Sequence, residues 1–151
     1  MDTIKYRPNV AAILQRADGR ILIGERTDVA NAWQFPQGGV DKGESLLQAL
    51  HRELWEELGI KPRTYTVAGE PRGPFRYLFT NARLKWGCHG QEQYYFLVTP
   101  HDDCEPRVDV KHPEFRTVKW IEPAEFQLSW LPEMKKQVYR DVFRDFFGIA
   151  L

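Results

Sequence analysis

Hydrophobic and polar residues follow two kinds of spacing along the chain, one typical of strands and one typical of helices. Residues 10–26 contain two apolar segments around an Asp18-Gly19 dipeptide, which is a strong short-range signal for a β-hairpin. Further strands are predicted at 64–70, 75–79, 91–100 and 115–121.

The first helix is predicted over residues 45–58. Ser45 is followed three residues later by Gln48, a pattern that caps a helix N-terminus through reciprocal hydrogen bonds. Gly59 then supplies a left-handed stop, and Ile60 supplies the hydrophobic contact that accompanies such a stop. The chain is expected to enter the helix at Ser45 and to leave it at Gly59.

A second helix is predicted in the C-terminal segment 131–151. Its hydrophobic residues Val138, Val142 and Phe146 recur four apart with Lys and Arg between them, which is typical of a surface helix docked on a sheet. Two segments show no periodicity and are expected to be loops, one rich in Gly, Pro and Asn at 27–39 and a long one at 101–114.

The order of these elements indicates the fold class. Strands and helices follow one another without a regular strand-helix-strand period, which favours a mixed central sheet flanked by helices, an α+β arrangement, over a doubly wound parallel fold. A length of 151 residues fits one compact domain over 1–151.

Composition excludes several classes of function. The 21 basic and 21 acidic residues cancel, so the total charge attracts the chain neither to nucleic acid nor to an anionic membrane, and any polyanion must be recognised locally. Cys88 and Cys104 lack metal-ligand spacing and are expected to be reduced thiols. Without a leader-like N-terminus or a long apolar run, we expect a cytoplasmic protein with no membrane segment and no obligate protein partner.

The predicted helix carries three carboxylates beside its core face. At 100° per residue, Glu53, Glu56 and Glu57 fall at about 0°, 300° and 40°, next to a single apolar stripe. That stripe consists of Leu47, Leu50, Leu54 and Leu58. Like charges at this spacing cost a helix roughly 0.2 to 0.5 kcal/mol per pair, so a purely structural helix gains nothing from them.

Two interpretations of the carboxylates stay open at this point. Arg52 can neutralise one of them but not all three, and clustered carboxylates with no His or Cys nearby favour Mg²⁺ or Mn²⁺. The alternative is a solvated acidic helix face. The glycines before the helix favour the metal, because Gly38, Gly39 and Gly43 allow the backbone to approach a ligand closely.

A known signature includes these residues. Gly38, five residues, Glu44, seven residues and then RELWEELGI at 52–60 resemble the complete box of the Nudix hydrolases, here 38–60. The resemblance implies an α/β/α sandwich that hydrolyses a nucleoside diphosphate linked to another group, using a divalent metal. It makes Glu53, Glu56 and Glu57 metal ligands, with the Gly38 carbonyl as a further ligand. Glu44 and Arg52 would stabilise the loop-helix geometry by pairing.

Segments outside the box resemble one branch of this family. YRPNV at 6–10, WQFPQGG at 33–39, GQEQYYFLV at 90–98 and PEF at 113–115 are similar to RNA pyrophosphohydrolases and asymmetrical dinucleoside tetraphosphate hydrolases. The resemblance implies a substrate with a 5′-polyphosphate end, either a triphosphorylated RNA or a dinucleoside polyphosphate.

The same resemblance assigns the remaining site residues. Glu114 would be the loop carboxylate that acts as general base or completes the metal shell, although Glu53 is an alternative base. Glu57 would be the third catalytic carboxylate. Phosphate contacts are expected from cations in the matching segments, namely Arg7, Arg26, Arg76, Lys85 and Lys135. Tyr77 would stack on or hydrogen-bond a nucleotide, or else belong to the core.

One departure affects substrate preference. Met134 stands where this branch often has an aromatic residue before Lys135 and Lys136, which weakens a base-stacking platform and leaves RNA and dinucleotide ends as alternatives. Two rival functions also remain: a nucleotide-sanitising or ADP-ribose-type pyrophosphatase with the same box, and a non-catalytic nucleotide- or RNA-binding module.

Overall fold

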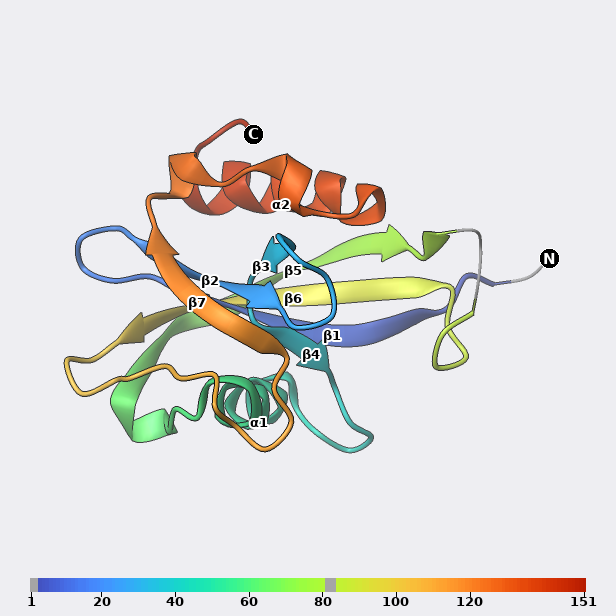
Figure 1. Cartoon of the computed structure of the whole chain (residues 1–151). Helices are drawn as coiled ribbons and strands as arrows, with labels where there is room; N and C mark the ends of the chain where they lie inside the picture. The colour runs from blue at the N-terminus through green and yellow to red at the C-terminus, as the bar shows by residue number, and fades with distance from the viewer. Residues whose placement is uncertain (1–2, 81–83) are drawn as a thin grey trace.

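The computed structural model describes residues 3–80 and 84–151 and has three layers. Figure 1 shows the strands of two β-sheets between two helices, α1 below and α2 above, and each helix packs on strands of both sheets. The predicted class, a mixed sheet with helices on both faces, is confirmed. None of the helices in the described residues is long and apolar enough to cross a membrane.

The strands form a mixed four-stranded sheet and an antiparallel three-stranded sheet. In the first, β1 and β6 are parallel and the other pairs are antiparallel. Its order is β4 (Gln37–Gly39), β1 (Tyr6–Leu14), β6 (Gly90–Pro100) and β5 (Tyr65–Leu78). The order of the second is β3 (Trp33–Gln34), β2 (Ile21–Arg26) and β7 (Phe115–Ile121).

The predicted hairpin over 10–26 is wrong in its pairing, although its turn is present. Gly19 has a positive φ of 90°, as a tight turn requires. Beyond one isolated bridge between Gln15 and Ile21, however, β1 and β2 diverge into different sheets. Both strands are buried in unbroken runs rather than alternately, which is typical of a strand covered on both faces.

Two further strand predictions need correction. The segments 64–70 and 75–79 form one strand, β5, whose pairing with β6 shifts register on each side of Arg72. The predicted loop 27–39 contains the short strands β3 and β4. The long loop 101–114 is confirmed, because it holds no helix or strand.

Both predicted helices are present. The helix α1 spans Leu46–Leu58, with the capping box between Ser45 and Gln48 and a left-handed Gly59 at its end. The helix α2 spans Glu133–Phe147. Short 3₁₀ helices lie at Pro62–Thr64, Pro123–Glu125 and Leu128–Trp130.

Each helix buries one face against the sheets and so creates its own core. On α1 the core face is Leu50, Leu54 and Leu58, whereas Leu47 was wrongly placed in it and is 45% exposed in the first turn. On α2 the buried residues include Val138 and Val142. Fixing α1 against the four-stranded sheet also fixes the position of its carboxylates beside β4.

Candidate active site

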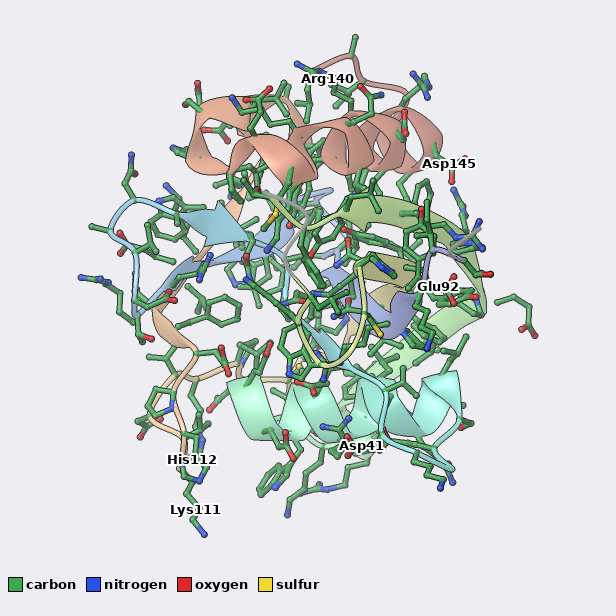
Figure 2. The ribbon with its side chains drawn as sticks, turned by 90° about the vertical axis from the view of Figure 1, so that its right-hand side faces the viewer. Asp41, Glu92, Lys111, His112, Arg140 and Asp145 are labelled. Carbon is green, nitrogen blue, oxygen red and sulfur yellow. The ribbon has the colours of Figure 1, made fainter. Side chains whose placement is uncertain are left out.

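A cleft of about 910 Å³ lies beside the carboxylates of α1. Its walls come from β1, β4, the start of β6, the outer side of α1 and the loop 101–114. Figure 2 shows Lys111 and His112 projecting from the outer tip of that loop. The cleft therefore brings together the box, the N-terminal strand and the loop that the sequence marked as functional.

Glu57 is the most buried carboxylate of the cleft, with 5% of its surface exposed. The backbone N–H of Gln37 hydrogen-bonds its carboxylate, but its Oε2 atom is buried without a partner among the described residues. Burial, followed by the charges of Glu53 and Glu114, raises the pKa of Glu57 well above its usual value. An unpartnered buried carboxylate oxygen is costly unless something else binds it.

Glu53 lies between Glu57 and the glycine turn. It shares a hydrogen bond with Glu57 and presses against the backbone of Gly38, where a Cβ atom would overlap its carboxylate. Burial raises the pKa of Glu53, and a hydrogen bond from Arg52 partly opposes that effect. Only glycine therefore fits at position 38 with Glu53 in this place.

Arg52 connects the glycine turn to the helix. It donates two hydrogen bonds to Glu44, from Nε at 2.8 Å and from Nη2 at 2.9 Å, and one to the carbonyl of Gly39 at 2.7 Å. The paired guanidinium lowers the pKa of Glu44, and Glu44 in turn raises that of Arg52. Glu44 also accepts from the backbone N–H of Asp41. These bonds hold the loop against the first turns of α1.

The same guanidinium contacts two carboxylates of the cleft. Arg52 Nη1 lies 2.8 Å from Glu53 Oε1 and 3.3 Å from Glu56 Oε2. Glu56 is the more open of the two, with 55% of its side chain exposed. Glu114 is exposed on the opposite wall, where its backbone carbonyl accepts from the N–H of Thr27 at 3.0 Å.

The oxygen atoms present suit a hard divalent cation. Glu53 and Glu57 meet beside Gly38, and the unpartnered Oε2 of Glu57 is a free ligand atom. Within residues 3–80 and 84–151, no three acidic, His or Cys side chains are already gathered around one point. The site thus fits a cation through this pair, and Glu56 would join it by leaving Arg52.

Arg7 is the one predicted phosphate contact that lines the cleft. Its guanidinium lies against Gly39, where a Cβ atom would collide with it, and its Cζ is 4.0 Å from the ring centroid of Trp86. Trp86 itself has a positive φ of 53° in a turn closed by Lys85 and Cys88. The turn therefore fixes the aromatic face that orients Arg7.

The other four predicted cations do not line this cleft. Arg76 pairs with Glu92 at 3.2 Å on the surface. Lys135, which hydrogen-bonds Gln34 at 3.2 Å, is near enough to Arg26 and Lys85 for their charges to affect it. Burial, with those charges, lowers the pKa of Lys135 to about 8. These three residues form a separate basic cluster.

Tyr77 belongs to the core, as the alternative interpretation held. Its surface is 7% exposed and its ring packs edge-to-face on Phe79, so it presents no open face for stacking on a base. Burial raises its pKa to about 12. Met134 is partly buried against the same core, with the hydroxyl of Thr80 3.3 Å from its sulfur.

Several residues of the cleft were not found from the sequence. Asn9 bonds Gln37 at 2.7 Å and accepts from Gln93 at 3.0 Å, so a buried amide chain supports the wall next to Glu57. The Oε1 atom of Gln91 is buried without a partner among the described residues. The motifs YRPNV, WQFPQGG and GQEQYYFLV contain these amides, but only strand pairing shows that Asn9, Gln37 and Gln91 line one cleft. Trp55 and Arg107 also line it.

Comparison with known proteins finds relatives over most of the chain. The NUDIX domain matches residues 5–146. The chain is 41% identical to the RNA pyrophosphohydrolase of Helicobacter pylori strain G27, over 94% of each protein. It is 35% identical to the RNA pyrophosphohydrolase of Aeromonas hydrophila, over 97% of this chain and 86% of the other.

A solved structure shows the same fold. The Escherichia coli dihydroneopterin triphosphate pyrophosphohydrolase superimposes with a TM-score of 0.67, at 20% identity, over 96% of this chain and 97% of that one.

Proposed function

The chain belongs to the Nudix family, and from this premise we propose that it is a cytoplasmic, divalent-metal-dependent pyrophosphohydrolase that acts on 5′-polyphosphate ends. The preferred substrate class is RNA with a 5′-triphosphate, converted to a 5′-monophosphate with loss of pyrophosphate. Dinucleoside polyphosphates are the second candidate, because the bond broken in them is also a phosphoric anhydride next to a 5′-nucleoside. Relatives at 35% and 41% identity named RNA pyrophosphohydrolases support the order of the two.

The observation that carries the proposal is the buried pair of Glu53 and Glu57. Two adjacent carboxyl groups with raised pKa values, one of them with an unpartnered oxygen, are expensive to bury without a ligand. A bound Mg²⁺ or Mn²⁺ would offset the cost of burying both carboxyl groups. Glu56, the Gly38 carbonyl and Glu114 would be its further ligands. A divalent cation, when bound, supplies polarisation of phosphate oxygens and acidification of water.

The protein's own groups have separate tasks in the reaction. Arg7 faces the cleft and is placed to bind phosphate oxygens, with its guanidinium held by Trp86 and Gly39. Glu53 or Glu114 accepts the proton of the attacking water at a carboxylate oxygen. Glu44 acts through Arg52 and the backbone of Asp41, by holding the turn that presents Gly38.

The first experiment compares four substrates in parallel. A short 5′-triphosphorylated RNA, diadenosine tetraphosphate, a deoxynucleoside triphosphate and ADP-ribose are each incubated with wild type and Mg²⁺, and kcat/KM is measured. The proposal expects the RNA to be the best substrate and to release pyrophosphate. Preference for the free nucleotide or ADP-ribose would instead favour the rival enzyme functions, and lack of turnover on all four would favour a binding module.

Glu56→Gln tests the site assignment in the same assay. Glu56 lies half exposed at the end of its ion pair with Arg52, so the substitution leaves the core intact. Loss of metal-dependent turnover is expected with an unchanged circular dichroism spectrum and melting temperature. Near-normal turnover would show that Glu56 is not needed to hold the cation and would contradict this part of the site assignment.

A further inference from the structure

An exposed tryptophan lies in the cleft wall formed by α1, the helix that also carries the carboxylates. Trp55 is 48% exposed on α1 and lines the same cleft as Glu53 and Glu57. Single exposed hydrophobic residues are normal on protein surfaces, so exposure alone assigns no role. What distinguishes Trp55 is its position inside a polar cleft together with cations.

One cation lies over this ring from the segment that follows α1, and a second cation lines the same cleft from the loop 101–114. Lys61 Nζ is 5.8 Å from the ring centroid of Trp55. Arg107 also lines the cleft, and its backbone N–H bonds the carbonyl of Leu58 at 2.9 Å. Its side chain lies against Gly59, where a Cβ atom would be 2.5 Å from its Nε. The loop is thus attached to the end of α1, with the Arg107 guanidinium held against Gly59 in the wall of the same cleft.

The second exposed tryptophan of the cleft, Trp86, differs from Trp55 because neighbouring side chains pack on its ring. The Cζ atom of Arg7 covers the ring of Trp86 at 4.0 Å, and Phe79 packs on it with ring centroids 6.0 Å apart. Trp55 has a cation only at 5.8 Å and no aromatic neighbour among the described residues. Trp55 is therefore the ring with an open face.

Resting on the proposed function, we propose that Trp55, with Lys61 and Arg107, forms a subsite for a second nucleobase of the substrate and its attached phosphate. Proteins hold single-stranded nucleotides by stacking bases on aromatic rings and placing cations along the backbone. The base comes either from the next nucleotide of an RNA 5′ end or from the second nucleoside of a dinucleoside polyphosphate. In either case it lies on the α1 side of the cleft, across the carboxylates from Arg7.

The test uses two substrate pairs that differ in the second nucleoside. One pair is diadenosine tetraphosphate and adenosine 5′-tetraphosphate. The other is a 5′-triphosphorylated dinucleotide and the corresponding nucleoside triphosphate. For each pair, the ratio of kcat/KM for the longer to the shorter substrate is compared between wild type and Trp55→Ala. Stacking of a base predicts that this ratio falls roughly 5- to 150-fold, through KM.

The variants Trp55→Phe and Leu78→Ala serve as controls. Trp55→Phe keeps an aromatic face and is expected to restore most of the ratio. Leu78 is 50% exposed on β5 outside the cleft, so Leu78→Ala is expected to leave the ratio unchanged. Lys61→Ala and Arg107→Ala should each lower the ratio less than Trp55→Ala, and the loss should shrink as salt is added.

The outcomes separate the two proposals. A fall in the ratio within one pair supports the subsite and identifies the RNA or the dinucleotide as the source of the base. If wild type turns over both pairs and Trp55→Ala changes neither ratio, the subsite is overturned and the proposed function stands. If wild type turns over none of the substrates, both are overturned.

Discussion

The backbone of Gly38 lies so close to the carboxylate of Glu53 that a Cβ atom at position 38 would overlap it. Gly38 does not have a positive φ, so alanine is compatible with its backbone and acts only through this collision. Gly38→Ala is therefore expected to displace the Glu53 carboxylate. The Mg²⁺ concentration for half-maximal activity should rise about 10- to 100-fold, the usual cost of disturbing the support of a metal ligand.

A second glycine provides the matched control. A Cβ atom at Gly24 would collide with the ring of Phe115 in the core instead of with a carboxylate. Gly24→Ala should therefore lower the melting temperature without changing the Mg²⁺ requirement of the protein that remains folded. An equal shift of the Mg²⁺ requirement in both variants would contradict the assignment of Glu53.

The raised pKa of Glu57 leads to a prediction of how the free energy of unfolding depends on pH when no divalent ion is present. Its folded pKa is raised above the ordinary value of 4.5, chiefly by burial, so the folded state holds a proton that the unfolded state has lost. The contribution of Glu57 to stability is complete below pH 4.5 and disappears as the pH rises through the folded pKa. In EDTA, the free energy of unfolding should therefore fall as the pH rises above 4.5.

The variant Glu57→Gln isolates this effect. Glutamine has similar size and no titrating proton, so the decline in stability with pH should become shallower than in wild type, with the remainder due to Glu53. Urea denaturation at several pH values measures it. Parallel pH profiles for the two proteins would exclude Glu57 as a source of the decline.

Local signals allowed much of α1 and its carboxylates to be predicted from the sequence. The capping box at Ser45, the stop at Gly59 and the spacing of Glu53 and Glu57 all depend on residues near one another in the chain. The prediction that Leu47 is buried was wrong, because the angular position of a residue around a helix does not show which turns of that helix contact the sheet.

Long-range pairing could not be predicted in the same way. The turn at Gly19 was recognisable, but whether β1 pairs with β2 depends on β4 and β6, which lie far along the chain. For a related reason, the sequence could not show which of the five predicted phosphate-binding cations line the cleft. Arg7 and Arg76 have equal weight in the sequence, and only the sheet shows that one faces the cleft and the other does not.

Arg7 and Arg76 therefore form a matched pair of substitutions. Arg7→Ala removes the guanidinium that lines the cleft and should raise KM for a polyphosphorylated substrate by about tenfold or more, the effect of losing a charge-assisted hydrogen bond. Arg76→Ala removes a surface ion pair with Glu92 and should leave KM within about twofold. Steady-state kinetics at fixed ionic strength measures both.

A larger rise in KM for Arg76→Ala than for Arg7→Ala would instead place phosphate binding on the outer side of β5. Trp86→Ala adds a check on the orientation of Arg7, since it removes the ring that lies 4.0 Å from the guanidinium. It should raise KM less than Arg7→Ala. Combining the two substitutions should add little to Arg7→Ala alone, because both act through the same group.

The final prediction concerns Lys135, which is a partly buried cation near two other cations. Burial, Arg26 and Lys85 lower its pKa from 10.5 to about 8. Between those values the unfolded state binds a proton that the folded state does not, so stability rises with pH from 8 to 10.5. At pH 7 the charged lysine destabilises the fold, and Lys135→Met should raise the free energy of unfolding by at most about 3 kcal/mol.

The neighbouring Lys136 shows whether this gain is specific to Lys135. Lys136 pairs with Glu133 at 2.9 Å on the same helix, and loss of such a surface pair changes stability by less than about 1 kcal/mol. Urea denaturation of Lys135→Met, Lys136→Met and wild type at pH 7 and pH 10 compares them. Because the penalty of Lys135 declines above pH 8, its variant should gain less at pH 10 than at pH 7. A gain that is the same at both pH values would mean that Lys135 improves packing when replaced and carries no charge penalty.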